Sequence, residues 1–331
     1  MKAKLLSTLK YILSLSVAVG LMYWVFSGID WKVFEEKAKE VNYWWVFFSI
    51  FISLIAYYAR AYRWNILLQP MGFKNLSIHR TTLAILIGYL ANLIFPRLGE
   101  VTRCGMMKRT DNVDMTNSFG TVITERLVDL LTLIVLFVFA LALEYDRLMT
   151  FIEQNLSLAK LGPFNILNIL MILVAVGSLG LVGLYFLFRL NVAFRNFVLN
   201  LWTGIISLKD INNVSGFLIS TLVLWFVYYL MSYTIVYALP ETSNLEWEVG
   251  IMLLVTGGIA LSIPVQGGFG TYHTLISAML SLYFVTRNTG VFLATLLHTS
   301  QIIATAIFGG VALAISFFIK RKKNVNTEQN I

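Results

Sequence analysis

The hydrophobic positions of this chain fall into long runs that are separated by short polar segments. A helix that crosses a membrane needs about 20 mostly apolar residues. Six runs meet that length, at residues 8–27, 44–69, 118–143, 163–188, 214–239 and 290–319. The pattern predicts an all-α polytopic integral membrane protein with about six full transmembrane helices.

Two further apolar stretches, 81–95 and 249–285, do not fit a simple crossing. The first is short, and the second is interrupted by SIPVQGGFGTYH at 262–273. Each contains a P-x-x-G sequence, in NLIFPRLGE and in ALSIPVQGG. Proline removes a backbone donor and glycine tolerates positive φ, so both residues interrupt a helix. We expect two re-entrant or broken-helix segments, the alternative being a bundle of eight or nine short, tilted spans.

The two breaks are related by a constant offset. Pro264 follows Pro96 by 168 residues, and the same offset carries the second and third spans close to the fifth and sixth. The halves would then have opposite topology, which predicts an inverted repeat with pseudo-repeats at about 5–145 and 160–320 in a single transmembrane domain, 1–331. Broken helices are tolerated in a membrane where they line a cavity. The residues expected to shape such a cavity near the midplane are Pro96, Gly99, Pro264, Gly267, Gly268 and Gly270.

The composition agrees with an integral membrane protein and limits the kinds of binding partner that we expect. Hydrophobic residues make up 58% of the chain and charged residues 13%, and the mean hydropathy is +0.77. The net charge is +8, but the lysines and arginines lie beside apolar runs and do not form a basic stripe interleaved with aromatic residues. We therefore expect no nucleic-acid partner. A single cysteine, Cys104, excludes an internal disulfide and a multi-cysteine metal site. We expect no metal and no cofactor, and nothing resembles a nucleotide-binding loop.

The distribution of lysine and arginine predicts the orientation. Cytoplasmic loops carry an excess of these residues. With the N-terminus inside and both broken segments re-entrant, 18 of the 25 lie inside, six lie outside and Arg126 lies within a span. We therefore expect a multi-pass protein of the cytoplasmic (inner) membrane with both termini cytoplasmic, ending in a short basic and polar tail at 321–331.

Charged residues within the third span are the strongest candidate site. In TERLVDLL, Glu125 lies about 10 Å along the helix from Ser118, and it shares a helix face with Asp129. Arg126 is placed to pair with Asp129. Charges at such depth are costly and by default line a pathway or pair with each other. The alternative is that the helix starts nearer residue 124, which would leave the charges at the cytoplasmic interface.

Further candidates flank the first break and follow the second. Arg60 and Arg63 lie one turn apart in RAYRWNILL, where they either snorkel to the interface or bind a phosphate bidentately. His273 follows the second break and is either structural or titrating. The predicted substrate-binding residues are Arg60, Arg63, Asn92, Arg97, Glu100, Arg103, Glu125, Arg126, Asp129 and His273.

These motifs, RAYRW, NLIFPRLGEVTR, ERLVDLL and IPVQGGFG, resemble a known family over about residues 5–320. It is the transmembrane, flippase-like domain found in the N-terminal half of lysylphosphatidylglycerol synthases (multiple peptide resistance factor) and in stand-alone membrane proteins. The resemblance implies movement of a lipid between leaflets. The family's last motif often ends in an acidic residue where this chain has His273, which puts an acid-dependent step there in doubt. The soluble aminoacyl-transfer domain is not found in this sequence, so we expect no enzyme and no catalytic residues.

The resulting hypothesis is a membrane lipid translocase for an anionic, aminoacylated or polyprenyl-phosphate-linked lipid. The arginines would collect the headgroup, and Glu125 and Asp129 would pair with them in the empty site or bind a cationic aminoacyl group. Three alternatives stay open: a small-solute or ion transporter of inverted-repeat type, a membrane partner of a lipid-modifying enzyme, and a lipid-linked glycosyltransferase that would use Asp30, Glu35, Glu36 and Glu40. A homo-oligomer is also compatible with the sequence.

Overall fold

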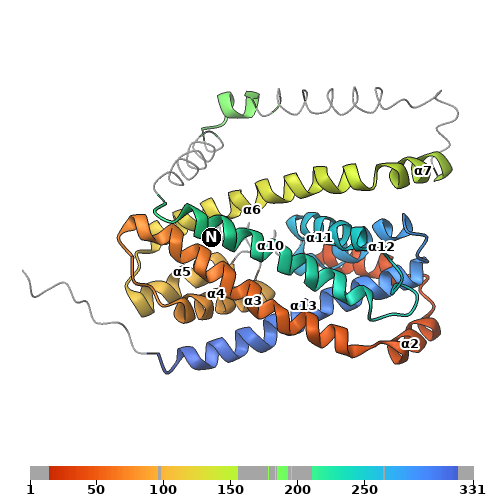
Figure 1. The fold of residues 1–331 in the computed structure, drawn as a ribbon, viewed down its shortest axis with the longest axis horizontal. Coiled ribbons are helices and arrows are strands. Elements are labelled where there is room, and N and C mark those ends of the chain that lie inside the picture. Colours follow the sequence, from red (N-terminus) through yellow and green to blue (C-terminus); the bar gives the residue numbers. More distant parts are fainter. Residues whose placement is uncertain are drawn as a thin grey trace, which may run out of the picture.

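The fold is a bundle of helices. The computed structural model describes residues 15–95, 98–155, 178, 183, 185–192, 195, 211–263 and 265–319. Every regular element with assigned bounds in these ranges is a helix, and the long ones lie roughly side by side (Figure 1). We call the end of the bundle that carries η1 (Gln69–Met71) the η1 end, and the opposite end, which carries α2 (Trp31–Glu40) and α7 (Tyr145–Asn155), the α2 end.

Four described helices are long and apolar enough to cross a membrane. They are α3 (Tyr43–Leu68), α6 (Met115–Leu143), α10 (Val214–Val236) and α13 (Arg287–Ser316). A fifth crossing results if the helix Leu15–Phe26 and α2, which meet at 88°, are counted as one span. These bounds confirm a polytopic helical membrane protein and match the predicted spans within a few residues. The predicted span 163–188 lies almost entirely outside the described residues, as do the start of the span 8–27 and the tail 321–331.

Side-chain caps fix where three of these helices begin. The side chain of Asn42 accepts from the amide of Trp44 at the start of α3, and that of Asn213 accepts from Gly216 at the start of α10. Thr286 plays the same part at the start of α13. An oxygen at this position satisfies one of the amides that have no partner within the helix.

The first apolar stretch forms a helical hairpin. α4 (Ile78–Ile94) ends at a non-helical Phe95, and α5 (Leu98–Asp111) packs back against it. Two glycines allow this close approach, since a Cβ added at Gly88 would lie 2.7 Å from the carbonyl oxygen of Gly99. Arg80 at the start of α4 donates to the carbonyl of Thr110 at the end of α5, 3.1 Å away. Both helices therefore share the η1 end, as expected of a re-entrant segment.

The second stretch forms a corresponding hairpin from the α2 end. α11 (Trp247–Ser262) is followed by the short η4 (Gln266–Gly268) and by α12 (Thr271–Ser281). Gly267, Gly268 and Gly270 have φ of 57°, 72° and 83°, a region that side chains with a Cβ rarely adopt. These glycines break the helix here as the sequence predicted, and Pro264 lies outside the described residues.

The tips of the two hairpins meet inside the bundle. We call Ile94 and Phe95 with Leu98 the first tip, and Ile263 with residues 265–270 the second tip. The side-chain amide of Gln266 in the second tip donates to the carbonyl of Ile94 in the first, at 3.4 Å. The two tips therefore face one another, and this hydrogen bond links them directly.

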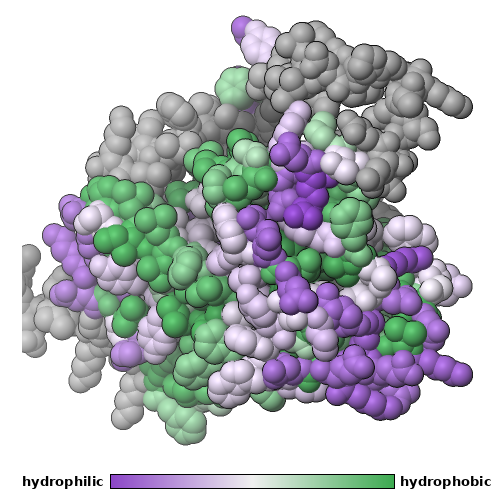
Figure 2. Space-filling model, turned by 45° about the vertical axis from the view of Figure 1, so that its right-hand side comes forward, coloured by the Kyte–Doolittle hydropathy of each residue, from purple (hydrophilic) through white to green (hydrophobic). Residues whose placement is uncertain are grey.

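The outer surface is largely apolar. Large hydrophobic side chains are exposed along α3, including Trp44, Phe47 and Phe51, and along α6. Figure 2 shows broad hydrophobic areas on one face next to a separate band of hydrophilic residues. Contiguous exposed apolar surface of this extent fits contact with lipid.

Polar contacts hold the α2 end together. Lys37 of α2 forms an ion pair with Glu241 in the loop after α10. Tyr283, which follows α12, donates to Glu144 between α6 and α7 at 2.8 Å, and Arg147 donates to the same carboxylate at 2.7 Å. The loops at this end are therefore connected across elements that are distant in sequence.

Candidate functional site

Three helices bring charged side chains together toward the η1 end of the bundle. α3 supplies Arg60 and Arg63, which lie one turn apart, and α6 supplies Glu125 and Asp129. The hairpin helix α5 supplies Arg103. We call these five residues the arginine–carboxylate cluster.

Short contacts connect every member of this cluster. The guanidinium of Arg60 donates to Asp129 at 2.6 Å and lies 3.2 Å from Glu125. Arg63 lies 2.7 Å from Asp129 and 3.5 Å from Glu125. Arg103 donates to the second oxygen of Glu125 at 3.1 Å. Glu125 thus contacts all three guanidinium groups, and Asp129 contacts two.

The cluster is buried within helices that can span a membrane. The side chains of Arg63 and Glu125 are completely inaccessible, and that of Asp129 is 15% exposed. α6 begins at Met115, so the alternative that it starts nearer residue 124 is wrong. The snorkelling interpretation of Arg60 and Arg63 is also wrong, because both guanidinium groups turn inward and pair with carboxylates. The predicted pairing with Glu125 and Asp129 is present.

The three guanidinium groups of the cluster have more hydrogen-bond donors than the two carboxylates can accept from. Six buried nitrogens have no hydrogen-bond partner among the described residues: Nε of Arg60, Nε, Nη1 and Nη2 of Arg63, and Nε and Nη2 of Arg103. Oε1 of Glu125 and Oδ1 of Asp129 also have none, although both lie within ion-pair distance of Nη2 of Arg63. Leaving a buried charged donor unpaired is costly, more so than for a neutral group. These donors are free to bind the oxygens of an anion.

Aromatic side chains support two of the arginines. The guanidinium carbon of Arg103 lies 4.6 Å from the ring centroid of Trp64, whose indole donates to Thr121 at 2.9 Å. That of Arg60 lies 5.9 Å from the ring of Tyr89. A cation over an aromatic face is attracted by the ring quadrupole, so these rings help to hold the charges in a dry environment. The sequence analysis did not identify either contact.

Arg126 and Glu100 form a separate pair beside the cluster. They are 2.6 Å apart, so the predicted pairing of Arg126 with Asp129 is wrong: Arg126 lies on another face of α6. A cavity of about 10 Å³ between them is lined by Asn92, Glu100, Arg103 and Arg126 among others. This is about the volume that one water molecule needs. The first hairpin and α6 therefore gather four of the predicted site residues around one small cavity.

Asn92 has a defined structural part in the first hairpin. Its side-chain oxygen accepts from the amide of Gly99 at 2.6 Å, so the start of α5 is already capped. The two remaining residues predicted at the first break, Pro96 and Arg97, lie outside the described residues.

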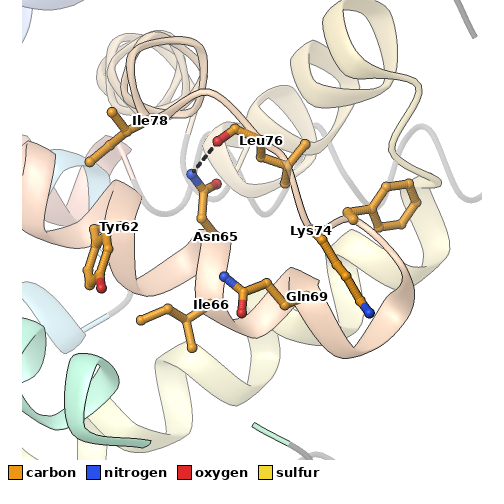
Figure 3. A pocket seen from close by; sticks show the side chains of 8 residues that line it. Tyr62, Asn65, Ile66, Gln69, Lys74, Leu76 and Ile78 are labelled. Carbon is orange, nitrogen blue, oxygen red and sulfur yellow. Dashed lines mark hydrogen bonds between the residues drawn. The ribbon is translucent and has the colours of Figure 1, made fainter. Parts of the chain in front are cut away.

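A larger pocket opens at the η1 end. It has a volume of about 390 Å³ and lies between the end of α3, the loop after η1 and the start of α4. Figure 3 shows Asn65 and Gln69 between Tyr62 and Lys74, with Asn65 donating to the carbonyl of Leu76 at 3.4 Å. Asn65 comes two residues after Arg63, so this pocket lies beside the helix that carries the cluster.

His273 lies apart from the arginines of the cluster, and among the described residues its ring contacts are with other aromatic rings. Its ring packs beside His298 of α13, with ring centroids 5.2 Å apart, and beside Phe26. The ring of His298 is held by the carbonyl of Gly267, 3.0 Å from Nε2. The structure thus separates His273 from the other predicted site residues. It also joins His273 to a histidine 25 positions away that the sequence analysis did not connect with it.

Among the described residues, no group of three or more His, Cys, Asp or Glu side chains is arranged to hold a metal ion. A family model described as the lysylphosphatidylglycerol synthase TM region matches residues 11–309. The chain belongs to this family. The match covers both hairpins, the arginine–carboxylate cluster and the histidine pair. Neither a curated protein nor a solved structure gave a significant match.

Membership of the lysylphosphatidylglycerol synthase TM family agrees with the apolar helices and with the motifs that carried the resemblance. It connects this membrane protein with lipid modification or transport. The family description alone specifies neither the lipid nor the chemistry at the arginine–carboxylate cluster.

Proposed function

We propose that this protein is a flippase-like lipid translocase of the cytoplasmic membrane, which moves a lipid with an anionic headgroup between leaflets. The substrate class is an anionic, aminoacylated or polyprenyl-phosphate-linked lipid. The observation that carries the proposal is the set of unpartnered guanidinium donors buried in the arginine–carboxylate cluster.

The charge of the cluster favours a single phosphate. Three guanidinium groups face two carboxylates, so the formal charge is +1 before a ligand binds. A phosphodiester brings one negative charge and several acceptor oxygens, which match arginine donors in geometry and strength. Glu125 and Asp129 hold the arginines in the empty site and compete with the headgroup, so that binding exchanges one set of ion pairs for another.

The order of the helices supports alternating access. A long helix, a broken hairpin and another long helix occur as α3, α4–α5 and α6, and again as α10, α11–α12 and α13. The hairpins enter from opposite ends and meet at their tips, which supports our proposal that the two halves form an inverted repeat. In our proposal the η1 end and both termini are cytoplasmic. The tips separate as the headgroup passes, while the hydrocarbon chains stay in lipid.

The test measures lipid movement in vesicles that contain only the purified protein. Fluorescent phosphatidylglycerol and phosphatidylcholine are compared, with an impermeant quencher added outside to report the leaflet. Arg103→Gln removes one charge-assisted hydrogen-bond donor, worth about 1.5–3 kcal/mol, so the rate for phosphatidylglycerol should fall roughly 10- to 100-fold. Lys39→Gln is the matched control, because it breaks an ion pair whose two side chains are both 71% exposed.

Two further variants protect the test against misfolding. Arg63→Gln leaves Asp129 with one partner fewer, and the double variant Arg63→Gln/Asp129→Asn removes that imbalance. Both should transport slowly if the guanidinium binds the headgroup. Wild-type rates in a folded Arg103→Gln protein would reject the proposal. Equal movement of both lipids would reject headgroup recognition by the cluster.

A further inference from the structure

Buried polar atoms in and beside the second tip are used neither by the fold nor by the arginine–carboxylate cluster. Nδ1 of His273, Nδ1 of His298 and Oε1 of Gln266 are buried and have no hydrogen-bond partner among the described residues. The two histidines are 2% and 4% exposed. Three such atoms around one break in a membrane-spanning bundle need a reason, because each one left unpaired costs free energy.

The backbone fixes the proton position of His298. The carbonyl of Gly267, 3.0 Å from Nε2, can only accept, so Nε2 carries the hydrogen and Nδ1 has a free lone pair when the ring is neutral. Gln266 is placed similarly, because its amide nitrogen donates to Ile94 and leaves Oε1 as an acceptor. This tip therefore lacks hydrogen-bond donors, the opposite of the arginine–carboxylate cluster.

The two imidazoles lie beside each other. Their centroids are 5.2 Å apart and their planes cross at 70°, and no hydrogen bond joins them, since Nδ1 of each ring has no partner. A proton taken up by one ring gives that ring a second N–H, which rotation about the side-chain bonds can direct at a free lone pair of the other ring. The charge is then shared by both rings, and a buried lone pair gains its donor.

Few other charged or titratable groups face the pair. Tyr272 of α12 stacks on His298 at 4.9 Å, and the helix Leu15–Phe26 contributes only the ring of Phe26. Arg287 of α13 donates to the carbonyls of Trp24, Val25 and Ser27, around that ring. Among the described residues, no carboxylate forms an ion pair with either histidine. The bound charge therefore has no fixed counter-ion beside it.

We propose that His273 and His298 form a proton-binding site whose loading and release drive the lipid movement. Its role as an energy source rests on the proposed function, whereas proton binding itself does not. A proton from water adds to a lone pair of one imidazole and gives a shared imidazolium, and its release to water on the other side restores the neutral pair. His298 of the pair is bonded to the carbonyl of Gly267, which is next to Gln266. Binding of a proton by the pair therefore affects the hydrogen bond by which Gln266 joins the two tips.

The first test observes the histidines of the wild-type protein directly. The chain has only three, and the third, His79, is exposed and serves as an internal reference. Protein labelled with ¹⁵N-histidine in lipid nanodiscs is titrated by NMR, and His79→Gln identifies the reference signal. We expect His298 as the Nε2–H tautomer at neutral pH, and one protonation step shared by the other two rings. Two independent titrations that match His79 would overturn the proton site.

The second test asks whether the site supplies energy. Vesicles with a pH gradient across the membrane are compared with vesicles at equal pH, using the same fluorescent lipids. The gradient should speed lipid movement in the wild type and in His79→Gln, and this effect should be lost in His273→Gln and in His298→Gln. Lipid movement that ignores the gradient in the wild type would overturn the energy coupling and leave the translocase intact. No movement in any variant would instead reject the translocase, and NMR alone would then decide the proton site.

Discussion

Removing the carboxylate of Glu125 should destabilise the protein strongly. Glu125→Gln keeps the shape of the side chain but leaves Asp129 as the only carboxylate of the cluster, and it removes the one ion pair that Arg103 forms among the described residues. The formal charge of the cluster rises from +1 to +2. Because the side chain is completely buried, solvent screening does not reduce the effect. Breaking a buried ion-pair network by removing one partner costs about 3–5 kcal/mol.

The single cysteine provides the assay. Cys104 is fully buried and adjacent to Arg103, so a thiol-reactive fluorophore labels it only when α5 separates from its neighbours. When labelling follows the opening equilibrium, about 3–5 kcal/mol corresponds to a rate increase of roughly two to three and a half orders of magnitude. Glu35→Gln is the control, since this side chain is 71% exposed in its pair with Lys39 and should change the rate little.

A second variant separates charge imbalance from general disruption. Glu125→Gln/Arg103→Gln restores the formal charge to +1, so it should label more slowly than Glu125→Gln alone. If Glu125→Gln labels at the wild-type rate, or if the double variant is the more labile, then the cluster is not held by mutual compensation of buried charges. The reasoning given for its burial would be refuted.

Two further predictions concern the first hairpin and the α2 end. Gly88→Ala should raise the Cys104 labelling rate, because its Cβ would lie 2.7 Å from the carbonyl oxygen of Gly99. An unchanged rate would show that α4 and α5 accommodate the extra methyl group without loss of stability. Burial tends to raise the pKa of Glu241, but the hydrogen bond and the charge of Lys37 outweigh burial and lower the pKa below the ordinary 4.5. The stabilisation of the folded protein by this ion pair is therefore present above pH 4.5 and is lost as the pH falls through the lowered pKa. Glu241→Gln should therefore reduce the drop in unfolding temperature between pH 7 and pH 3, and an undiminished drop would contradict this.

The spans and the helix breaks were predictable from sequence because each depends on local composition. A run of apolar residues is long enough to cross a membrane or it is not, and the glycines at 267, 268 and 270 interrupt any helix that contains them. The pairing of Glu125 and Asp129 with arginines was also indicated, since charges inside an apolar run have few alternatives to pairing. The inward orientation of Arg60 was not, because an arginine near the end of a span can equally reach the interface.

The partners of these charges could not be predicted because they depend on how the helices are rotated about their axes. One face of α6 meets the arginines and another meets Glu100, which is why Arg126 pairs away from Asp129. The contact of His273 with His298 requires α12 to pack on α13, and nothing local to either residue indicates it. Tertiary packing decides such contacts, whereas the sequence pattern decides only that a helix forms.

The hydrogen bond from Gln266 to Ile94 connects the two tips more weakly than the ion pairs connect the helices at the η1 end. A single long hydrogen bond of 3.4 Å contributes about 1 kcal/mol or less, which thermal motion overcomes readily. The charged contacts among α3, α5 and α6 resist separation far more, since breaking them exposes buried ions. The contact between the tips is therefore broken more easily than the contacts among α3, α5 and α6, so these three helices serve as the frame against which the second hairpin moves.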